Sequence, residues 1–164
     1  MNVKAPEGEY VTDPAALVLL PGAAQAVRRL NDAGLRVVLV SNQRCVARGL
    51  ASMAEVARVH DRLAELLAAA GAHLDGWYVC PHEARECDCR KPLPGLLLAA
   101  AADAGIDLAA ATMVGDAESD VLAGRAAGTA TVRIAPPGTA SAADLVVPTL
   151  ADAVDHLVRS GSVA

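Results

Sequence analysis

The densest group of chemically reactive side chains lies in the segment CPHEARECDCRKP, residues 80–92. Cys80 and His82 form one pair with a single residue between them, and Cys87 and Cys89 form a second. The four residues between the pairs let the chain fold back, so that all four side chains can surround one tetrahedral ion. Thiolate and imidazole ligands favour zinc, and four protein ligands leave no open position, which predicts a structural site. The alternative is that the cysteines only pack as small apolar groups in the interior.

Two cations, Arg90 and Lys91, follow the last of these cysteines directly, and Pro92 and Pro94 keep the segment extended and stiff. An Arg-Lys pair is often no more than part of a solvated surface. After a metal-binding loop, however, the same pair is held in place, and we expect it to bind an anion.

The segment VSNQRCVARG, residues 40–49, places Ser41 and Asn42 where an apolar strand gives way to a loop. Hydroxyl, amide and backbone N–H groups at such a position can bind phosphoryl oxygens, and Arg44 and Arg48 add positive charge nearby. An ordinary turn is the alternative, because Ser and Asn are common turn residues.

A second strand ends in carboxylates, in the segment MVGDAESD, residues 113–120. Asp116 lies at the strand end itself and is the better candidate for a cation ligand. Asp120 is four residues further on, where a carboxylate also favours the start of a helix through the helix dipole. For Asp120 we therefore expect the helix-start role over a catalytic one.

The elements that must position these residues alternate along the chain. Apolar strands are predicted at 36–42, 76–80, 112–115, 129–134 and 144–147, and helices at 22–32, 52–70, 94–104 and 119–127, with a last helix capped by Thr149 and Asp152. Strands that are apolar throughout and alternate with helices predict a parallel sheet covered on both faces. Because ligands sit at the carboxyl ends of such strands, the polar strand ends should converge on one rim.

Composition narrows the class of protein. The 164 residues are 54% hydrophobic with 2% aromatics, which predicts a single domain, 1–164, with an aliphatic core. The zinc loop expected from the cysteine spacing, 80–91, lies within this domain. A net charge of -5 argues against a nucleic-acid binder. No apolar run approaches the length of a membrane span and the N-terminus has no signal-peptide pattern, so we expect a cytoplasmic protein without a membrane partner. We also expect a monomer.

Taken together and in this order, the motifs resemble those of a known family. VSNQ…ARG, CPH…CDCRKPLPG and MVGDAESDVLAGRAAG are similar to motifs II, III and IV of the haloacid dehalogenase-like (HAD-like) phosphatases. Within that family they resemble the zinc-containing branch of D-glycero-D-manno-heptose 1,7-bisphosphate phosphatases and histidinol phosphatases. The resemblance extends to APEGEYVTDPAALVLLPGA, residues 5–23.

The resemblance implies a Rossmann-like three-layer α/β/α fold and a mechanism. In the family an aspartate nucleophile takes the phosphoryl group, an aspartate two residues on acts as general acid and base, and Mg²⁺ neutralises charge. By position, Ser41 would bind the phosphoryl group, Lys91 would stabilise it, Asp116 would bind Mg²⁺ and the Cys/His set would hold structural zinc. A phosphorylated sugar or similar phosphomonoester would be bound by Ser41, Asn42, Gln43, Arg44, Arg90 and Lys91.

The first motif of the family, an apolar strand running into Asp-x-Asp-Gly, has no counterpart here, because no two aspartates of the chain are two residues apart. In the family this strand lies in the middle of the sheet, between the strands that end at Ser41 and Asp116. We therefore expect the sequence to be truncated, with a start called too late, and to be inactive unless extended upstream. A natural protein without this strand is the less favoured alternative, because two unpaired strand edges would leave buried polar groups.

Two smaller departures concern the substrate. The chain has Arg44-Cys45 where the family often has Ser-Gly, and Ala117 where it often has Lys. Three functions stay open at this point: heptose bisphosphate phosphatase, which we favour, histidinol-phosphate phosphatase, and a non-catalytic, zinc-stabilised module that binds anions.

Overall fold

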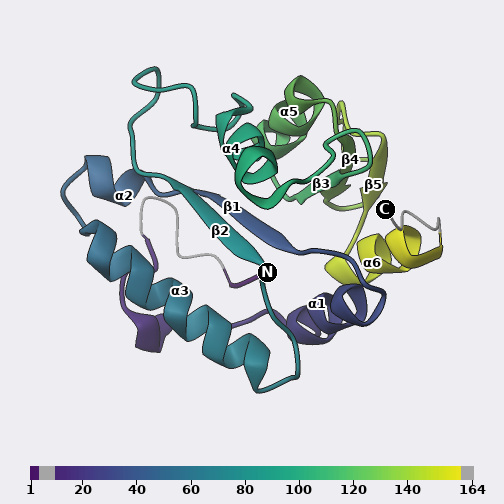
Figure 1. Cartoon of the computed structure of the whole chain (residues 1–164), viewed down its shortest axis with the longest axis horizontal. Coiled ribbons are helices and arrows are strands. Elements are labelled where there is room, and N and C mark those ends of the chain that lie inside the picture. The colour runs from purple at the N-terminus through teal and green to yellow at the C-terminus, as the bar shows by residue number, and fades with distance from the viewer. Residues whose placement is uncertain (4–9, 160–164) are drawn as a thin grey trace.

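The computed structural model describes residues 1–3 and 10–159. Residues 5–9 of the predicted N-terminal resemblance lie outside this part of the chain. Its elements, in chain order, are η1 (Pro14–Ala16), α1 (Ala23–Asp32), β1 (Val38–Asn42), α2 (Arg44–Ala47), α3 (Met53–Ala68), β2 (Gly76–Cys80), α4 (Gly95–Ala104), β3 (Thr112–Gly115), α5 (Glu118–Ala127), β4 (Ala130–Ile134), β5 (Leu145–Val147) and α6 (Leu150–Arg159). Strands and helices alternate, which confirms the predicted α/β fold (Figure 1).

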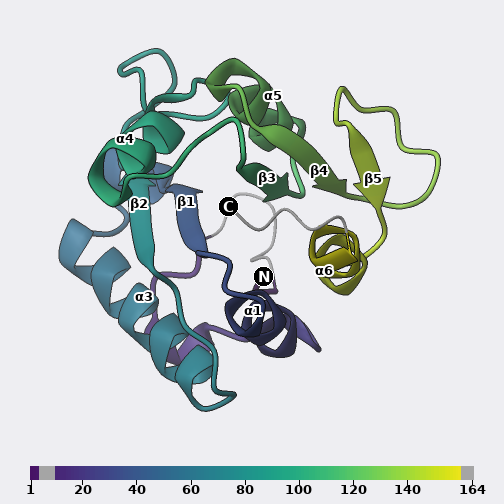
Figure 2. The same ribbon diagram turned by 45° about the vertical axis from the view of Figure 1, so that its right-hand side comes forward.

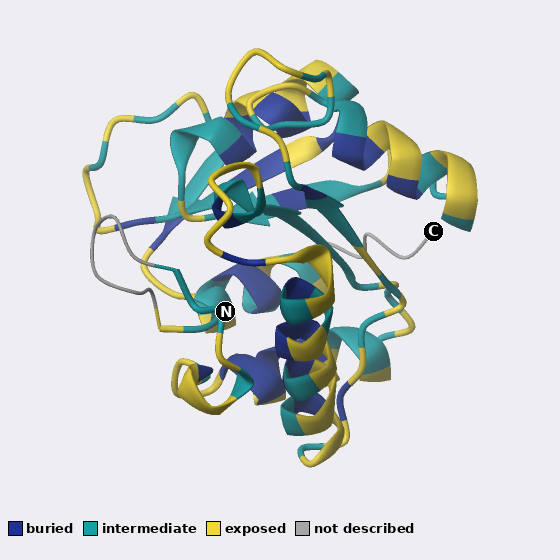
Figure 3. Ribbon diagram, turned by 90° about the vertical axis from the view of Figure 1, so that its left-hand side faces the viewer, coloured by how far each residue is buried: buried dark blue, intermediate teal, exposed yellow. Residues whose placement is uncertain are grey.

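Local sequence signals explain where the helices begin. Ser52 Oγ accepts a hydrogen bond from the Glu55 backbone N–H at 3.2 Å, and the Glu55 carboxylate accepts one from Ser52 N at 2.7 Å. This reciprocal cap starts α3, whose buried residues recur every three or four positions along one face (Figure 3). Thr149 and Asp152 cap α6 in a similar way.

The helices cover two faces of the strands. Helices α4 and α5 lie on one face, and α1, α3 and α6 lie on the other (Figure 1). The apolar clusters follow this division. Leu39 of β1 packs toward α1 and α3, and Val40 packs toward Leu97 of α4 and Met113 of β3.

All pairs between named strands are parallel, but they form two sheets instead of one. β1 pairs with β2, while β3, β4 and β5 form a separate sheet in that order. Figure 2 shows β1 and β3 as the facing strands of the two sheets. A cavity of about 1080 Å³ is lined by residues of both strands. The position between these strands, where the central strand of the family was expected to be missing, is therefore without a strand in the part of the chain described.

Backbone alternation shows which groups face this cavity. Val37 O accepts from Asp75 N and Gln43 N donates to Cys80 O, so the odd-numbered residues of β1 bond toward β2. Successive residues of a strand point their N–H and C=O groups to opposite edges, so Val38 and Val40 present theirs to the open edge. All five residues of β1 are only half-buried, which is unusual for an apolar strand with helices on both faces.

Most predicted boundaries agree with the structure to within two residues, and the strands 76–80 and 112–115 agree fully. The prediction of a loop after Asn42 was wrong for residues 44–47, which form the single turn α2. Such a short helix has no periodicity to detect. Within the described ranges, none of the helices combines the length and the apolar character of a membrane span.

Candidate functional site

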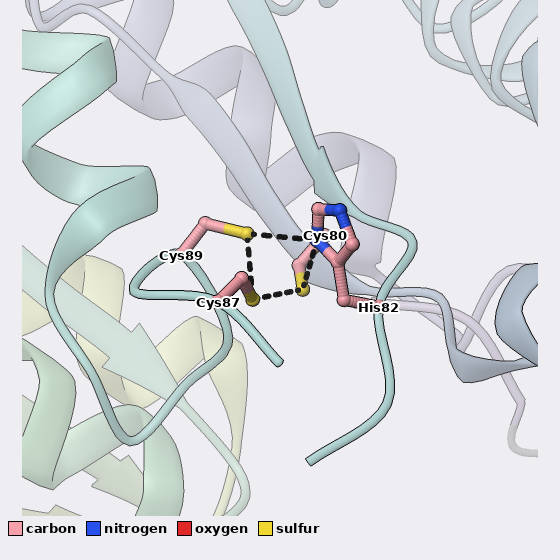
Figure 4. A group of neighbouring side chains, drawn as sticks. All are labelled: Cys80, His82, Cys87 and Cys89. Carbon is pink, nitrogen blue, oxygen red and sulfur yellow. Dashed lines mark hydrogen bonds between the residues drawn. The ribbon is translucent and has the colours of Figure 1, made fainter. Parts of the chain in front are cut away.

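The four predicted zinc ligands converge at the end of β2. One ligand atom from each of Cys80, His82, Cys87 and Cys89 lies within 4.8 Å of all the others (Figure 4). Cys80 Sγ is 3.5 Å from Cys87 Sγ and 3.8 Å from His82 Nδ1, and Cys89 Sγ is 3.1 Å from Cys87 Sγ and 3.4 Å from His82 Nδ1.

Three of these separations, 3.4 to 3.8 Å, are close to those around a zinc ion, whereas the 3.1 Å between Cys87 Sγ and Cys89 Sγ is shorter. With zinc–sulfur and zinc–nitrogen bonds of about 2.3 and 2.0 Å, a tetrahedron places its ligand atoms roughly 3.5 to 3.8 Å apart. The thiols are close enough to hydrogen-bond to one another. Burial raises the pKa of Cys87, but hydrogen bonds from Cys89 and Cys80 outweigh it and lower the value to about 7. Burial and the neighbouring thiols raise the pKa of Cys89 to about 12. A cation at the centre would stabilise the thiolates together.

Lys91 is anchored at the open edge of β1. Its ammonium group donates to Val40 O at 2.8 Å and lies 2.7 Å from the Asp120 carboxylate. The two side chains are 11% and 9% exposed, so this ion pair is almost fully shielded from water. Lys91 therefore connects β1 to the start of α5 at one end of the cavity.

Ser41, Asn42 and Gln43 line the same cavity as Lys91 and Asp116. Gln43 Nε2 donates to Ser41 Oγ at 2.9 Å, which orients the hydroxyl. Lys91 Nζ contacts both Val40 O of β1 and the carboxylate of Asp120, which follows β3, and the ends of both strands line one cavity. These two strand ends therefore lie near each other, as predicted.

The three arginines of the predicted site have other partners. Glu83 of the Cys/His loop forms ion pairs with Arg44 and with Arg48, the latter at 3.6 Å, and the hydrogen bond from Arg44 lowers the pKa of Glu83. Arg90 Nη1 donates to His82 O at 3.0 Å. The Cys/His loop is thus tied to α2 by charge, and Arg90 closes the loop on itself.

At the end of β3, Asp116 is exposed and offers one carboxylate to the cavity. Asp120 accepts a hydrogen bond from Ala117 N at 3.1 Å, which confirms its expected role at the start of a helix. Gly115 is required here, because a Cβ atom at this position would collide with the Asp120 side chain. The carboxylate of Asp120 also binds Lys91, a contact between residues 29 positions apart that no local sequence pattern predicts.

Two further contributors were missed. Glu83 lies within the segment CPHEARECDCRKP but was given no role there. Its only signal was a carboxylate beside the Cys/His set, with Arg44 and Arg48 elsewhere in the chain. The role of the Val40 carbonyl could not be predicted from the sequence, since every residue has a backbone carbonyl. Both contacts depend on how the chain folds.

Comparisons with known proteins agree with this geometry. A model of the haloacid dehalogenase-like hydrolases matches residues 3–128. D-glycero-beta-D-manno-heptose-1,7-bisphosphate 7-phosphatase of Yersinia pestis is 39% identical over 157 residues, covering 87% of this chain and 84% of that protein. D-glycero-D-manno-heptose-1,7-bisphosphate 7-phosphatase of Thermosynechococcus vestitus is 48% identical over 131 residues, covering 73% and 67%.

Among solved structures, the D,D-heptose 1,7-bisphosphate phosphatase of B. bronchiseptica, complexed with magnesium and phosphate, superposes with a TM-score of 0.86 at 33% identity. The match covers 97% of this chain and 94% of that one. Sequence family, relatives and fold agree with one another and with the motifs at the strand ends. The chain therefore belongs to the haloacid dehalogenase-like hydrolases.

Proposed function

We propose that this protein is a sugar-phosphate phosphatase that removes the 7-phosphate of D-glycero-D-manno-heptose 1,7-bisphosphate. One observation carries the proposal: Ser41, Lys91 and Asp116 come from three separate segments and line one cavity at the carboxyl ends of β1 and β3. A hydroxyl, an ammonium group and a carboxylate at such a position are suited to a phosphoryl group and its cation. The names of the relatives above supply the substrate.

In this proposal Ser41 donates a hydrogen bond to a phosphoryl oxygen, and Lys91 stabilises its negative charge. Asp116 would contribute one carboxylate to Mg²⁺, an ion that usually takes one or two carboxylates together with substrate phosphate and water. When bound, Mg²⁺ supplies charge neutralisation at the phosphoryl oxygens. Arg90 and the residues Asn42, Gln43 and Arg44 would lie near the sugar. The Cys/His set would hold zinc with a purely structural role, since its four ligands complete a tetrahedron.

The nucleophile must come from elsewhere, because the chain contains no Asp-x-Asp pair. We propose that a strand carrying this pair fills the position between β1 and β3 and that the 164 residues alone do not turn over substrate. The half-buried β1, the cavity of about 1080 Å³ and the backbone groups of Val38, which face this cavity, support this placement. A strand there would carry its carboxyl end to Ser41, Lys91 and Asp116.

The test is phosphate release from heptose 1,7-bisphosphate with Mg²⁺, comparing the 164-residue chain with a fusion that adds an apolar strand and Asp-x-Asp-Gly ahead of Met1. We expect turnover only in the fusion, and none when the first added aspartate is changed to asparagine. Histidinol phosphate, assayed in parallel, tests the second substrate class. An inactive fusion beside a zinc-loaded, cooperatively folded short chain would refute the proposal and support an anion-binding module.

A further inference from the structure

The amide side chain of Asn42 makes an unusual pair of contacts with Lys91. Its Oδ1 accepts a hydrogen bond from Lys91 N at 3.1 Å, and its Nδ2 donates one to Lys91 O at 3.0 Å. Both backbone groups of one residue are therefore bound by one side chain, which acts as a peptide group of a neighbouring strand would. The two residues are 49 positions apart in the chain.

The sheet holds Asn42 firmly enough to serve as an anchor. Asn42 is the last residue of β1 and lies opposite Cys80, the first of the metal ligands, and the next residue continues the ladder through Gln43 N and Cys80 O at 2.8 Å. Lys91 follows two residues after Cys89, the last of the ligands. The segment that leaves the Cys/His loop is thus attached to the sheet by Asn42.

Residues of β1 therefore bind both the backbone and the ammonium group of Lys91. Asn42 binds its backbone, and Val40, two residues earlier on the same strand, accepts from its ammonium group at 2.8 Å. Asp120 holds the ammonium group from the other side of the cavity at 2.7 Å. An ammonium group has three N–H donors, so these contacts fix its position and leave one donor for a bound anion.

We infer that Asn42 is a positioning residue that places the Lys91 ammonium group at the phosphoryl site, instead of contacting the substrate itself. Its amide oxygen and nitrogen each already serve Lys91, and a side chain held in this way keeps the lysine backbone from shifting when an anion arrives. The catalytic meaning of this role rests on the phosphatase function proposed above, whereas the structural role of Asn42 can be tested without turnover.

Chemical modification of lysine can test this role, because Lys4 and Lys91 are the only lysines of the chain. Acylation of Lys91 by acetic anhydride, followed by peptide mass spectrometry of the full, zinc-loaded chain, reports how often the buried ammonium group becomes accessible. Asn42→Asp keeps the shape of the side chain but turns the Nδ2 donor into an oxygen that faces Lys91 O. We expect acylation of Lys91 to become about tenfold faster, as the loss of such a pair of hydrogen bonds predicts.

Gln43→Glu is the matched control. It makes the same chemical change one residue away, at an amide that bonds Ser41 and Cys45 and not Lys91, so the rate should stay within about twofold of the original. Zinc content is measured in every variant and should be unchanged. If Asn42→Asp does not fold, Asn42→Ser replaces it, since a short hydroxyl cannot bond both groups of Lys91.

An unchanged acylation rate in the folded Asn42 variant would overturn the inference. In the active, aspartate-bearing form, a positioning role further predicts that Asn42→Asp lowers kcat and adds little to the loss already caused by Lys91→Met. A rise in KM that adds in full to the effect of Lys91→Met would instead show direct contact with substrate. Failure of the phosphatase assay alone leaves the acylation result intact, so the two proposals can fail separately.

Discussion

The Cys/His cluster and the strand-end site lie on either side of β1 and are held together in different ways. All four ligands of the cluster come from residues 80–89, and their ligand atoms meet within 4.8 Å. The strand-end site takes Ser41, Lys91, Asp116 and Asp120 from three distant segments around a cavity that no strand of the described residues fills. A short loop can close the first site almost alone, whereas the second depends on the packing of both sheets.

The two regions meet at the segment after Cys89. Arg90 bonds back to the Cys/His loop, and the next residue, Lys91, belongs to the strand-end site. The segment after the Cys/His loop therefore positions the Lys91 ammonium group between β1 and the start of α5. This arrangement suggests that the cluster should tolerate damage to the strand-end site better than the strand-end site tolerates loss of the cluster.

Loss of the metal should have the largest effect. Cys87→Ser removes one of four ligands, and we expect zinc content to fall from one per chain to nearly none and the melting temperature to drop by roughly 10 °C, since metal binding contributes directly to folding. Elemental analysis and circular dichroism measure both. Cys45→Ser is the control. Cys45 is buried outside the cluster, so this variant should keep its zinc. Retention of a full zinc ion by Cys87→Ser would contradict the four-ligand site.

Breaking the ion pair should come next. Lys91→Met leaves Asp120 buried without its cation, which we expect to cost about 3 kcal/mol of unfolding free energy in urea titrations, with zinc content preserved. Changing Asp120→Leu in the same chain removes the stranded charge and should restore much of that loss. A double variant no more stable than Lys91→Met would show that Asp120 is not the partner that matters.

Two glycines allow the regions to be disturbed one at a time. A Cβ atom at Gly115 would collide with Asp120, and one at Gly95 would collide with the backbone of Asp88, which lies between two metal ligands. Each alanine substitution should cost about 1 to 3 kcal/mol. Gly95→Ala should also weaken zinc retention against a chelator, whereas Gly115→Ala should not. Equal zinc loss in the two variants would mean that the regions are less separate than the structure indicates.

The smallest effect concerns a third region, the contact between His60 and Trp77, whose rings lie 4.5 Å apart and nearly perpendicular. Burial lowers the pKa of His60 below its ordinary value of 6.5. At pH values between this lowered pKa and 6.5, the unfolded chain binds more protons at His60 than the folded chain does. The stability that the buried, neutral His60 contributes is therefore complete above pH 6.5 and is lost as the pH falls below 6.5.

His60→Leu should therefore flatten the decline of unfolding free energy between pH 7 and 5 by less than about 1.4 kcal/mol per pH unit. Fluorescence of Trp77, the only tryptophan, follows unfolding in each variant. His73→Leu is the control, because the side chain of His73 is 64% exposed. Contributions of groups that are the same in all three proteins cancel in the comparison. An unchanged slope in His60→Leu would contradict a buried, neutral His60.

Some features could be predicted from the sequence for a clear physical reason. Strands such as 76–80 and 112–115 are short apolar runs bounded by turn residues, and Ser52 with Glu55 forms a helix cap. Residues close together in the sequence determine both kinds of feature. The Cys/His set follows the same logic, because bringing its side chains together needs only close spacing in the chain. The single turn α2 was not predicted, because four residues are too few to show the helical periodicity of apolar positions.

By itself, then, the sequence determined the α/β alternation, the Cys/His set and the lack of an aspartate pair, since each is a matter of residue type and short spacing. Only the tertiary structure decided that Asn42 binds the backbone of Lys91, that Asp120 pairs with its ammonium group and that Glu83 holds Arg44 and Arg48. These contacts join segments far apart in the chain. Their formation depends on which strand edges and helix ends the packed sheets bring together, and no local spacing encodes that.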